Sequence, residues 1–321
     1  MRRKLFLDTD GGVDDAQALL MLIAAGRCPD LITTVFGNVA LGAATRNILT
    51  VLAVSGRPDV PVHMGADRPL NQPRLDATNI HGEDGLGGAP RPSVIPEPAG
   101  DDAVDVLVSS LRDAARRGDK VDLLLIAPLT NLALALQAAP DCVAGIGQLT
   151  LMGGSIHGRG NVTPAAEFNI FADPEAAAIV FRAEIDIVMV PWETCVAHRI
   201  SGACVDVLFE ALPGGRETDF SRALVTHARN TIAEFGGGDS FRFVDPLAAA
   251  VAIEPSIVTR SLRASVDVAL APGLTRGMTV VDPSGRLETP TVTLVEVVDF
   301  DRLVSLYRAS IAQNALAISK T

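Results

Sequence analysis

The hydrophobic positions along the first two-thirds of the chain form two kinds of segment that alternate. Short runs rich in Val, Ile and Leu, apolar on both faces, are typical of strands buried in a parallel sheet. Such runs lie at residues 4–8, 31–38, 60–66, 121–127, 148–154 and 186–192. Longer segments with helical periodicity lie between several of them, at residues 14–26, 44–56, 102–118 and 173–183. This order of strands and helices predicts an α/β fold with an open, mostly parallel sheet and helices on both faces.

The last part of the chain has a different pattern, which predicts antiparallel strands near the C-terminus. Residues 264–299 contain β-rich runs separated by Pro-Gly and Pro-Ser-Gly turn signals. Residues 300–317 then have a helical pattern that closes the chain. We therefore expect a Rossmann-like sheet with a small antiparallel addition. No internal repeat, low-complexity linker or domain boundary is visible, so residues 1–321 are expected to form a single domain.

Two segments interrupt the regular pattern and are candidates for ligand-binding loops. Residues 67–100 are rich in Pro, Gly and polar residues, and a loop of this length in a compact domain is usually functional or mobile. Residues 229–242 contain three consecutive glycines, at positions 236–238. We predict that this second segment is a mobile flap that closes over a bound ligand and excludes water.

Charge and cysteine usage narrow the classes of partner. The formal net charge is −11, and no basic run is long enough to follow a phosphate backbone, so a nucleic acid polymer is not an expected partner. Cys28, Cys142, Cys195 and Cys204 are widely spaced, which favours reduced thiols over a zinc site or a disulfide framework. The apolar stretch after the basic N-terminus is interrupted at Asp8, and no later run is long enough to cross a membrane. We expect a soluble, cytoplasmic protein without a membrane partner.

The most specific chemical signal follows the first predicted strand. The segment DTDGGVDD places Asp8, Asp10, Asp14 and Asp15 within eight residues, at a strand end where α/β sheets bind their ligands. At an effective dielectric constant of about 20, two like charges about 4 Å apart repel by roughly 4 kcal/mol. A cation would relieve this repulsion, and carboxylate oxygens favour calcium or magnesium over zinc. Capping of the following helix explains one aspartate well but explains four poorly.

A second enzyme class also places aspartates after its first strand. Phosphatases of the haloacid dehalogenase type have a DxD motif there, with one aspartate as nucleophile and magnesium beside it. In this chain Asp8 would be that nucleophile. Such an enzyme also needs a phosphate-binding lysine and a later acidic pair, and no such arrangement follows a strand here. The adjacent pair Asp14 and Asp15 is also unexpected for that class.

The same segment resembles the N-terminal signature DxDxGxDD of the inosine-uridine-preferring nucleoside hydrolases. The resemblance continues, in the family's order, through VFGNV, HGEDGLGG, APLTNLALAL, LMGG, GNVTPAAEFNIFADPEAA and VDPLAAA. These blocks cover most of the chain. The resemblance implies calcium-dependent hydrolysis of the N-glycosidic bond of ribonucleosides, which yields ribose and a free base. It also implies a small-molecule nucleoside as substrate and a homodimer or homotetramer.

The resemblance implies a specific set of ligands for the calcium ion. Asp10, Asp15 in bidentate fashion and Asp245 would bind it through carboxylates, and Ile126 would bind it through its backbone carbonyl. The family usually has threonine and glycine where this chain has Ile126 and Ala127, but a carbonyl ligand tolerates a change of side chain. Water and the ribose 2′- and 3′-hydroxyls would complete the six to eight oxygens that calcium prefers.

Ribose binding is implied for a further set of residues. Acceptors and amides at fixed angles suit a vicinal diol. Loop residues of these types also stabilise turns, and Met152 and Phe168 equally suit core packing. The residues that match the family's sugar contacts are Asp14, Asn161, Glu167, Asn169 and Asp245, with the Met152 backbone beside the sugar and Phe168 or Trp192 stacked on ribose or base.

The reaction that the resemblance implies needs a base, a positioned water and help for the leaving group. Asp10 would remove a proton from water held at the calcium ion, and Asn38 would orient that water. His81, in a glycine-rich loop, is a candidate for a position near the base; His198 is a weaker one. Well-studied members have a histidine immediately before the last ligand aspartate, whereas this chain has Val244, so protonation of the leaving base by that route is absent.

Three open points remain at the level of sequence. Phe235, Phe241 and Phe243 lie where the family places mobile residues near the base, and we expect them on the base side. The loss of the histidine at position 244 leaves two alternatives within the same scaffold, namely a ribose- or nucleoside-binding protein and a hydrolase of an atypical N-riboside. The sequence does not decide between purine and pyrimidine bases.

Overall fold

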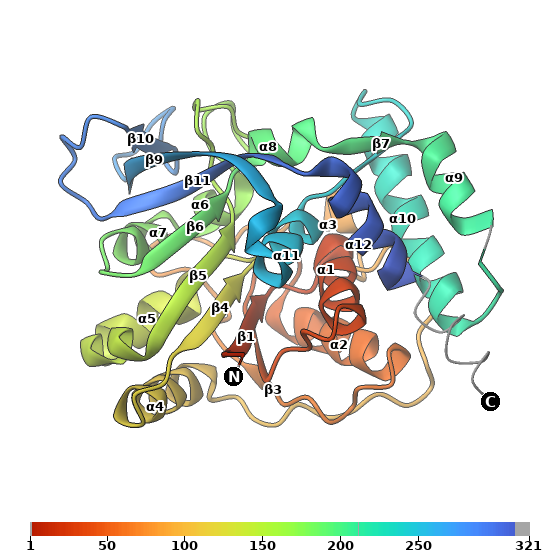
Figure 1. The fold of residues 1–321 in the computed structure, drawn as a ribbon, viewed down its shortest axis with the longest axis horizontal. Helices are drawn as coiled ribbons and strands as arrows, with labels where there is room; N and C mark the ends of the chain where they lie inside the picture. Colours follow the sequence, from red (N-terminus) through yellow and green to blue (C-terminus); the bar gives the residue numbers. More distant parts are fainter. Residues whose placement is uncertain (1, 211, 312–321) are drawn as a thin grey trace.

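The computed structural model describes residues 2–210 and 212–311, and its main feature is a nine-stranded sheet (Figure 1). The order of strands across the sheet is β10-β9-β11-β6-β5-β4-β1-β2-β3. All neighbours pair in parallel except β9, which runs antiparallel to both β10 and β11. The strands are β1 (Lys4–Thr9), β2 (Leu31–Thr34), β3 (Val62–Met64), β4 (Val121–Leu125), β5 (Ile146–Met152), β6 (Asp186–Val190), β9 (Val258–Val268), β10 (Thr279–Asp282) and β11 (Thr291–Val298).

Helices cover both faces of this sheet because successive residues of each strand point to opposite sides. Leu5 and Leu7 of β1 pack with one group of helices, whereas Phe6 packs with the other. The first group consists of α1 (Val13–Ala24), α2 (Leu41–Val54), α10 (Arg216–Glu234), α11 (Asp245–Ile253) and α12 (Phe300–Ile311). The second consists of α4 (Ala103–Arg116), α5 (Thr130–Ala138) and α7 (Pro174–Phe181). The mostly parallel sheet covered on both faces confirms the predicted fold class.

Shorter elements complete the described chain. They are the helices α3 (Thr78–His81), α6 (Phe168–Ala172), α8 (Trp192–Ala197) and α9 (Gly202–Glu210), and the 3₁₀ turns η1 (Pro140–Gly145) and η2 (Pro255–Ile257). The antiparallel strands β7 (Arg199–Ser201) and β8 (Ser240–Arg242) form a separate two-stranded sheet. None of the helices in the described part of the chain has the length and apolarity needed to cross a membrane.

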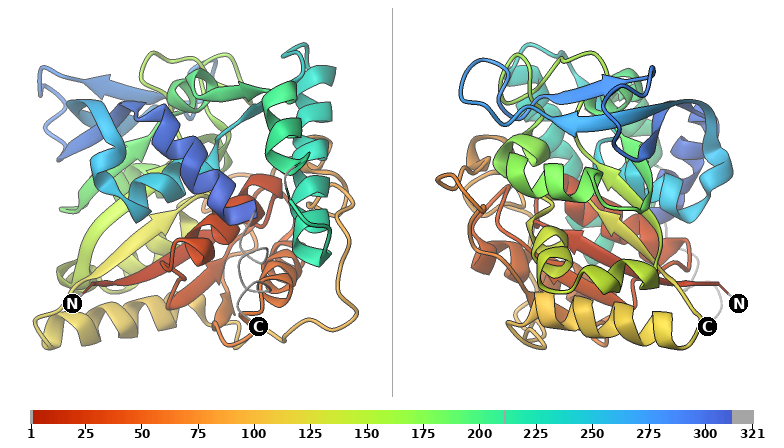
Figure 2. Two further views of the ribbon diagram at one scale, coloured as in Figure 1. Left: turned by 45° about the vertical axis from the view of Figure 1, so that its right-hand side comes forward. Right: turned by 90° about the vertical axis from the view of Figure 1, so that its left-hand side faces the viewer.

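The C-terminal antiparallel strands belong to the main sheet instead of forming a separate unit. β11 pairs in parallel with β6, and β9 and β10 then extend the same sheet. Figure 2 shows these blue strands together at one edge of the molecule. β9 begins at Val258, six residues before the predicted β-rich segment, because its first half pairs with the end of β11. The predicted last helix is α12 as far as Ile311, and its remaining predicted residues, 312–317, lie outside the described residues.

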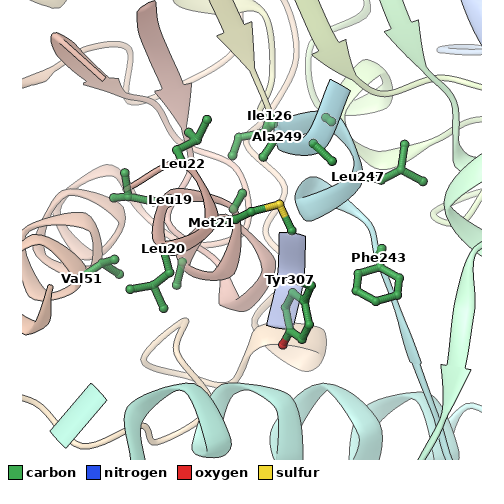
Figure 3. Close-up of a cluster of buried hydrophobic side chains, with 14 of the residues drawn as sticks. Leu19, Leu20, Met21, Leu22, Val51, Ile126, Phe243, Leu247, Ala249 and Tyr307 are labelled. Atoms are coloured by element: carbon green, nitrogen blue, oxygen red, sulfur yellow. The ribbon is translucent and has the colours of Figure 1, made fainter. Parts of the chain in front are cut away.

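The hydrophobic core joins α1 to the C-terminal helices α11 and α12. Met21 extends from α1 into a cluster that contains Leu247 of α11 and Tyr307 of α12 (Figure 3). Phe243 is fully buried in the same cluster, with its ring centroid 5.2 Å from that of Tyr307 in an edge-to-face arrangement. Phe243 therefore packs in the core, whereas the sequence suggested a place for it on the base side of the site. This cluster fixes the position of α11, whose first residue is Asp245.

Candidate active site

The carboxyl ends of the central parallel strands meet at one edge of the sheet, and the acidic cluster lies there. The chain leaves β1 at Thr9 and begins α1 at Val13, so the turn between them spans only three residues. Gly11 adopts a positive φ of 67°, a conformation that other residues rarely adopt. This sharp turn directs Asp10 toward the end of β2 and places Asp14 and Asp15 in the first turn of α1.

Asp10 and Asp15 share one partner, Asn38, from the loop after β2. The backbone N–H of Asn38 donates to Asp10 Oδ2 (2.7 Å), and its side-chain Nδ2 donates to Asp10 Oδ1 (2.8 Å). The same Nδ2 also donates to Asp15 Oδ2 (3.0 Å). Asp15 is held further by Thr9 Oγ1 and by the backbone N–H of Gly12 (2.9 Å). The two carboxylates are therefore adjacent and fixed in orientation.

The start of α11 adds a further carboxylate, Asp245, to the same cluster. One oxygen each of Asp14, Asp15 and Asp245 lies within 4.8 Å of the others. Asp245, more than 200 residues away in sequence, is only 3% exposed. Among the described residues, His81 Nδ1 lies 3.6 Å from Asp14 Oδ1, and no Lys or Arg forms an ion pair with these acids. Asp14 Oδ1 is buried and has no hydrogen-bond partner.

Burial makes the charged state of these acids unfavourable in the absence of a cation. Burial raises the pKa of Asp14 to about 6, and burial together with the neighbouring carboxylates raises the pKa values of Asp10, Asp15 and Asp245. His81, beside Asp14, has a pKa lowered to about 4 and supplies no positive charge near pH 7. A group of carboxylate oxygens with an unpaired buried atom and no compensating positive charge fits a hard divalent cation. Zinc is disfavoured because neither cysteine nor histidine belongs to the three-carboxylate group.

The residues expected to contact ribose line the next part of the site. Glu167 caps α6, accepting hydrogen bonds from the backbone N–H groups of Asn169 (3.0 Å) and Gly154 (2.8 Å), and burial raises its pKa to about 7. Asn169 Nδ2 donates to the carbonyl oxygen of Met152 (3.2 Å), which orients the amide. Asn161 Oδ1 accepts from the backbone N–H of Phe168 (2.8 Å). The loop 160–169 is therefore held rigidly by the same side chains that face the pocket.

His81 lies beside the acidic cluster and has a defined hydrogen-bond role. Its Nδ1 accepts from the backbone N–H of Val13 (3.1 Å), so the neutral ring carries its hydrogen on Nε2. Burial lowers the pKa of His81 to about 4, so the ring is neutral near pH 7. A Cβ on Gly12 would lie 2.7 Å from His81 Nδ1 and 2.4 Å from Asn38 Nδ2. A side chain at position 12 would therefore displace His81 and Asn38, so glycine is required there.

A cavity of about 520 Å³ opens over this cluster, a volume typical of sites for small ligands. Asp10 and Asp15 lie beneath its lining, both fully buried. The predicted residues that line it are Asp14, Asn38, His81, Ile126, Met152, Asn161, Glu167, Phe168, Asn169 and Asp245, and Trp192, Phe235, Phe241 and Val244 join them. The structure thus brings together every residue that the sequence assigned to ribose binding, whereas Phe243 and His198, which the sequence placed near the base, do not line the cavity.

The cavity also contains residues that the sequence did not single out. Gln17 comes from α1, Asn79 from α3, and His227 and Thr231 from α10. Asn79 lies in the segment 67–100, which the sequence analysis proposed as a ligand-binding loop because of its length. Thr231 lies within the segment 229–242 that was predicted to cover a ligand. His227 had no such signal, because an amphipathic helix does not reveal by its pattern which polar residues face a ligand.

Three other predicted features differ in the structure. Asp8 is buried away from the cavity lining, and its carboxylate accepts a hydrogen bond from Asn131 Nδ2 (2.8 Å) and another from Thr33, so it is not placed as a nucleophile. His198 is buried between the Thr194 carbonyl and the backbone of β11, outside the cavity. The proposed flap is shorter than expected, because residues 229–234 belong to α10 and residues 240–242 belong to β8.

Comparison with known proteins identifies the group to which this site belongs. The sequence profile described as inosine-uridine preferring nucleoside hydrolase matches residues 5–305. The chain belongs to this family. The matched segment contains the acidic cluster, the loop 160–169 and Asp245, and it ends within α12.

Individual nucleoside hydrolases match over nearly their whole length. The non-specific ribonucleoside hydrolase RihC of Escherichia coli O1:K1 / APEC is 39% identical over 292 residues, which are 90% of this chain and 91% of RihC. The pyrimidine-specific ribonucleoside hydrolase RihA of Enterobacter sp. (strain 638) is 36% identical over 319 residues, covering 98% and 99%. Among solved structures, the plant nucleoside hydrolase PpNRh1 superposes with a TM-score of 0.86 at 29% identity, covering 97% and 99% of the two chains.

Proposed function

We propose that the chain hydrolyses the N-glycosidic bond of ribonucleosides to give ribose and a free base. The observation that carries the proposal is the convergence of Asp10, Asp14, Asp15 and Asp245 at a cavity of about 520 Å³, a volume typical of small-ligand sites. Membership of the nucleoside hydrolase family supports the same reaction. Asp8 accepts a hydrogen bond from Asn131 and lies outside the cavity lining, which argues against the phosphatase alternative.

The proposed cofactor is a divalent cation, and its donor set favours calcium. Asp10, Asp15 and Asp245 would hold it through carboxylates, and the backbone carbonyl of Ile126 would complete the protein ligands. Asn38 supports this set because it bonds both Asp10 and Asp15 and so keeps the two carboxylates side by side. When bound, such a cation lowers the pKa of a water molecule and neutralises the clustered acids.

In the proposed reaction, the oxygen of a water molecule attacks C1′ of the ribose while the bond from C1′ to the base nitrogen breaks. Asp10 takes the proton of that water, and the two hydrogen bonds from Asn38 hold Asp10 in place. The electron pair of the broken bond leaves with the base. The surrounding carboxylates favour the positive charge that develops on the sugar.

The pocket walls would position the ribose for this attack. Asp14 has a buried oxygen without a partner, and Glu167 and Asn169 present fixed acceptor and donor groups from the start of α6. Asn161 at the rim would contact the far side of the sugar, and the neutral His81 would donate from Nε2. A rigid arrangement of this kind reduces the entropy lost when the substrate binds.

A panel of purine and pyrimidine nucleosides, assayed with calcium and with chelator, tests the proposed function. We expect release of ribose from at least one nucleoside, lost on chelation and restored by calcium. p-Nitrophenyl riboside, which has a good leaving group, extends the panel to weakly active enzymes, and p-nitrophenyl phosphate tests the phosphatase alternative. Ribose binding without release of any base would instead support the binding-protein alternative, and turnover of p-nitrophenyl riboside alone would support an atypical N-riboside as substrate.

We also propose a cytoplasmic location and a homodimer or homotetramer. The four cysteines are unpaired, including the buried Cys142 and Cys195, which suits a reducing compartment. The relatives named above belong to one family but differ in their named base preference, so no base is assigned to this chain from them. Light scattering coupled to gel filtration measures the oligomeric state directly, and a monomer at micromolar concentration would contradict that part of the proposal.

A further inference from the structure

Gln17 combines deep burial with a complete lack of hydrogen-bond partners. Its side chain is 2% exposed, and neither Oε1 nor Nε2 has a partner among the described residues. It also lines the cavity. Burying an amide without partners costs folding free energy, so such groups are uncommon and call for an explanation. A ligand that bonds this amide would supply the missing partners.

The position of Gln17 on α1 separates it from the groups assigned to the sugar. It lies three residues after Asp14, so the two side chains share one face of the helix, with Gln17 about one turn further along. α1 packs against α10, whose residues Ala228 and Thr231 line the cavity wall on that side. The residues assigned to ribose binding come instead from loop 160–169 and the start of α6. We therefore place the amide on the base side of the cavity.

Other polar groups near this wall are already engaged within the protein. His227 Nε2 donates to the carbonyl oxygen of Ile80 (2.9 Å), and Thr231 Oγ1 donates to the same oxygen (3.4 Å). His81 Nδ1 is occupied by the backbone of Val13. Val244 lies in the wall and offers no donor or acceptor in its side chain. Apart from Gln17, the cavity residues with a buried, unpaired side-chain atom are Asp14, in the acidic cluster, and Arg242, which stacks on Trp192.

We propose that Gln17 binds the leaving base and stabilises its departure. Nε2 donates to the ring nitrogen or exocyclic oxygen that gains negative charge, and Oε1 accepts from an adjacent N–H of the same base. The substrate class is therefore a nucleoside whose base carries a donor and an acceptor side by side, as the lactam edges of uracil and hypoxanthine do. This inference rests on the proposed function, because it assigns a residue to the leaving group of that reaction.

The amide would act without transferring a proton. The base takes the electron pair of the broken bond and then gains a proton from solvent. A hydrogen bond from Nε2 strengthens as the acceptor becomes negative, so it stabilises the transition state more than the bound substrate. A residue with this role affects substrates that leave as poor anions and has little effect on those that leave as stable anions.

The experiment compares Gln17→Leu with wild type on inosine, uridine and p-nitrophenyl riboside. Leu keeps much of the volume and removes both polar atoms. We expect kcat/KM for the better nucleoside to fall by roughly tenfold to a hundredfold, the range for a lost hydrogen bond to a charged group. We expect kcat/KM for p-nitrophenyl riboside to change by less than about threefold, because p-nitrophenolate needs no such stabilisation. Gln137→Leu, at an exposed position of α5, is the matched control and should leave kcat/KM unchanged for all three substrates.

Each other outcome has a distinct meaning. An equal loss on nucleosides and on p-nitrophenyl riboside would show that Gln17 only supports the fold, and no loss on nucleosides would show that it does not touch the base. If Gln17→Leu fails to fold, Gln17→Met gives the same comparison. If wild type hydrolyses no riboside, the proposed function fails. Calorimetry with hypoxanthine then tests Gln17 by itself, and equal affinity of wild type and variant would overturn its role.

Discussion

Asp10 is the residue on which the proposed chemistry depends most, and its surroundings explain why. It is fully buried, accepts two hydrogen bonds from Asn38 and lies next to Asp15. Two hydrogen-bond donors on one side of the carboxylate fix its orientation, as the proposed role in activating water requires. Burial and the charge of Asp15 raise the pKa of Asp10 in the absence of a cation, and a bound cation would offset both effects and keep the carboxylate ionised.

Replacing Asp10 by asparagine should remove the base and preserve the shape of the site. We expect kcat to fall by roughly 10²- to 10⁴-fold on every active riboside, including p-nitrophenyl riboside, because water activation is common to all of them. Circular dichroism and thermal unfolding establish that the variant folds. Asp105→Asn, at an exposed position of α4, is the control and should keep full activity. An Asp10→Asn enzyme with wild-type kcat would exclude Asp10 as the base.

Among single residues, the sequence predicted best those site residues that lie together in one contiguous motif. Asp10, Asp14 and Asp15 lie together in the chain, so their proximity in space follows from one tight turn. Gln17 follows immediately in the same helix but was not predicted, because an unpaired amide is recognised only when its neighbours are known. His227 was missed because its hydrogen bond to the Ile80 carbonyl and its place at the cavity depend on how α10 packs. Whether a polar side chain on an amphipathic helix is bonded within the protein is a property of packing, not of sequence pattern.

Glycines control how closely the strand-end loops approach one another, and Gly37 gives the sharpest example. It lies in the loop after β2, immediately before Asn38. A Cβ added to Gly37 would lie 1.9 Å from Asp10 Oδ2, far inside van der Waals contact. The loop after β2 can therefore reach the end of β1 only because this position has no side chain.

Gly37→Ala should displace Asp10 and reduce both stability and activity. We expect a loss of about 1–3 kcal/mol in the free energy of unfolding, typical of overpacking. We expect a loss of roughly 10²-fold in kcat, because a displaced base no longer points at the water. Urea unfolding and steady-state kinetics measure the two effects. Gly42→Ala is the matched control, since its Cβ meets nothing within 4 Å and position 42 lies in α2. Unchanged activity in Gly37→Ala would mean that the loop adjusts freely.

Among the elements, the buried parallel strands were predicted best, because their runs of Val, Ile and Leu are apolar on both faces and recur between helical segments. β7 and β8 were not predicted. Each has only three residues, and their pairing joins Arg199 to Arg242 across more than 40 residues of chain. The flap was predicted too long because Gly236 to Gly238 were taken as the centre of a loop. The structure instead extends α10 to Glu234, and the glycines follow its end directly.

At the scale of the whole molecule, the fold gathers mutually repelling carboxylates from distant parts of the chain at one edge of the nine-stranded sheet. Asp10 and Asp15 come from the first strand and helix, Glu167 from the middle of the chain, and Asp245 from α11. The net charge of −11 offers no long-range compensation. Folding therefore buries several acids together, and a cation that binds only the folded cluster should stabilise the entire fold.

Calcium should consequently raise the thermal stability of the protein, independently of any substrate. A ligand present at 100 times its Kd and bound only to the folded state contributes about 2.7 kcal/mol. For a chain of this size that corresponds to a rise in Tm of roughly 5 °C. Differential scanning calorimetry in EDTA and in excess calcium measures the shift. Asp245→Asn should lose most of it, because the variant removes one ligand and part of the repulsion, whereas Asp105→Asn should keep it. Equal Tm values in EDTA and in calcium would mean that the folded cluster binds no calcium, and the metal-dependent part of the proposed function would then fail.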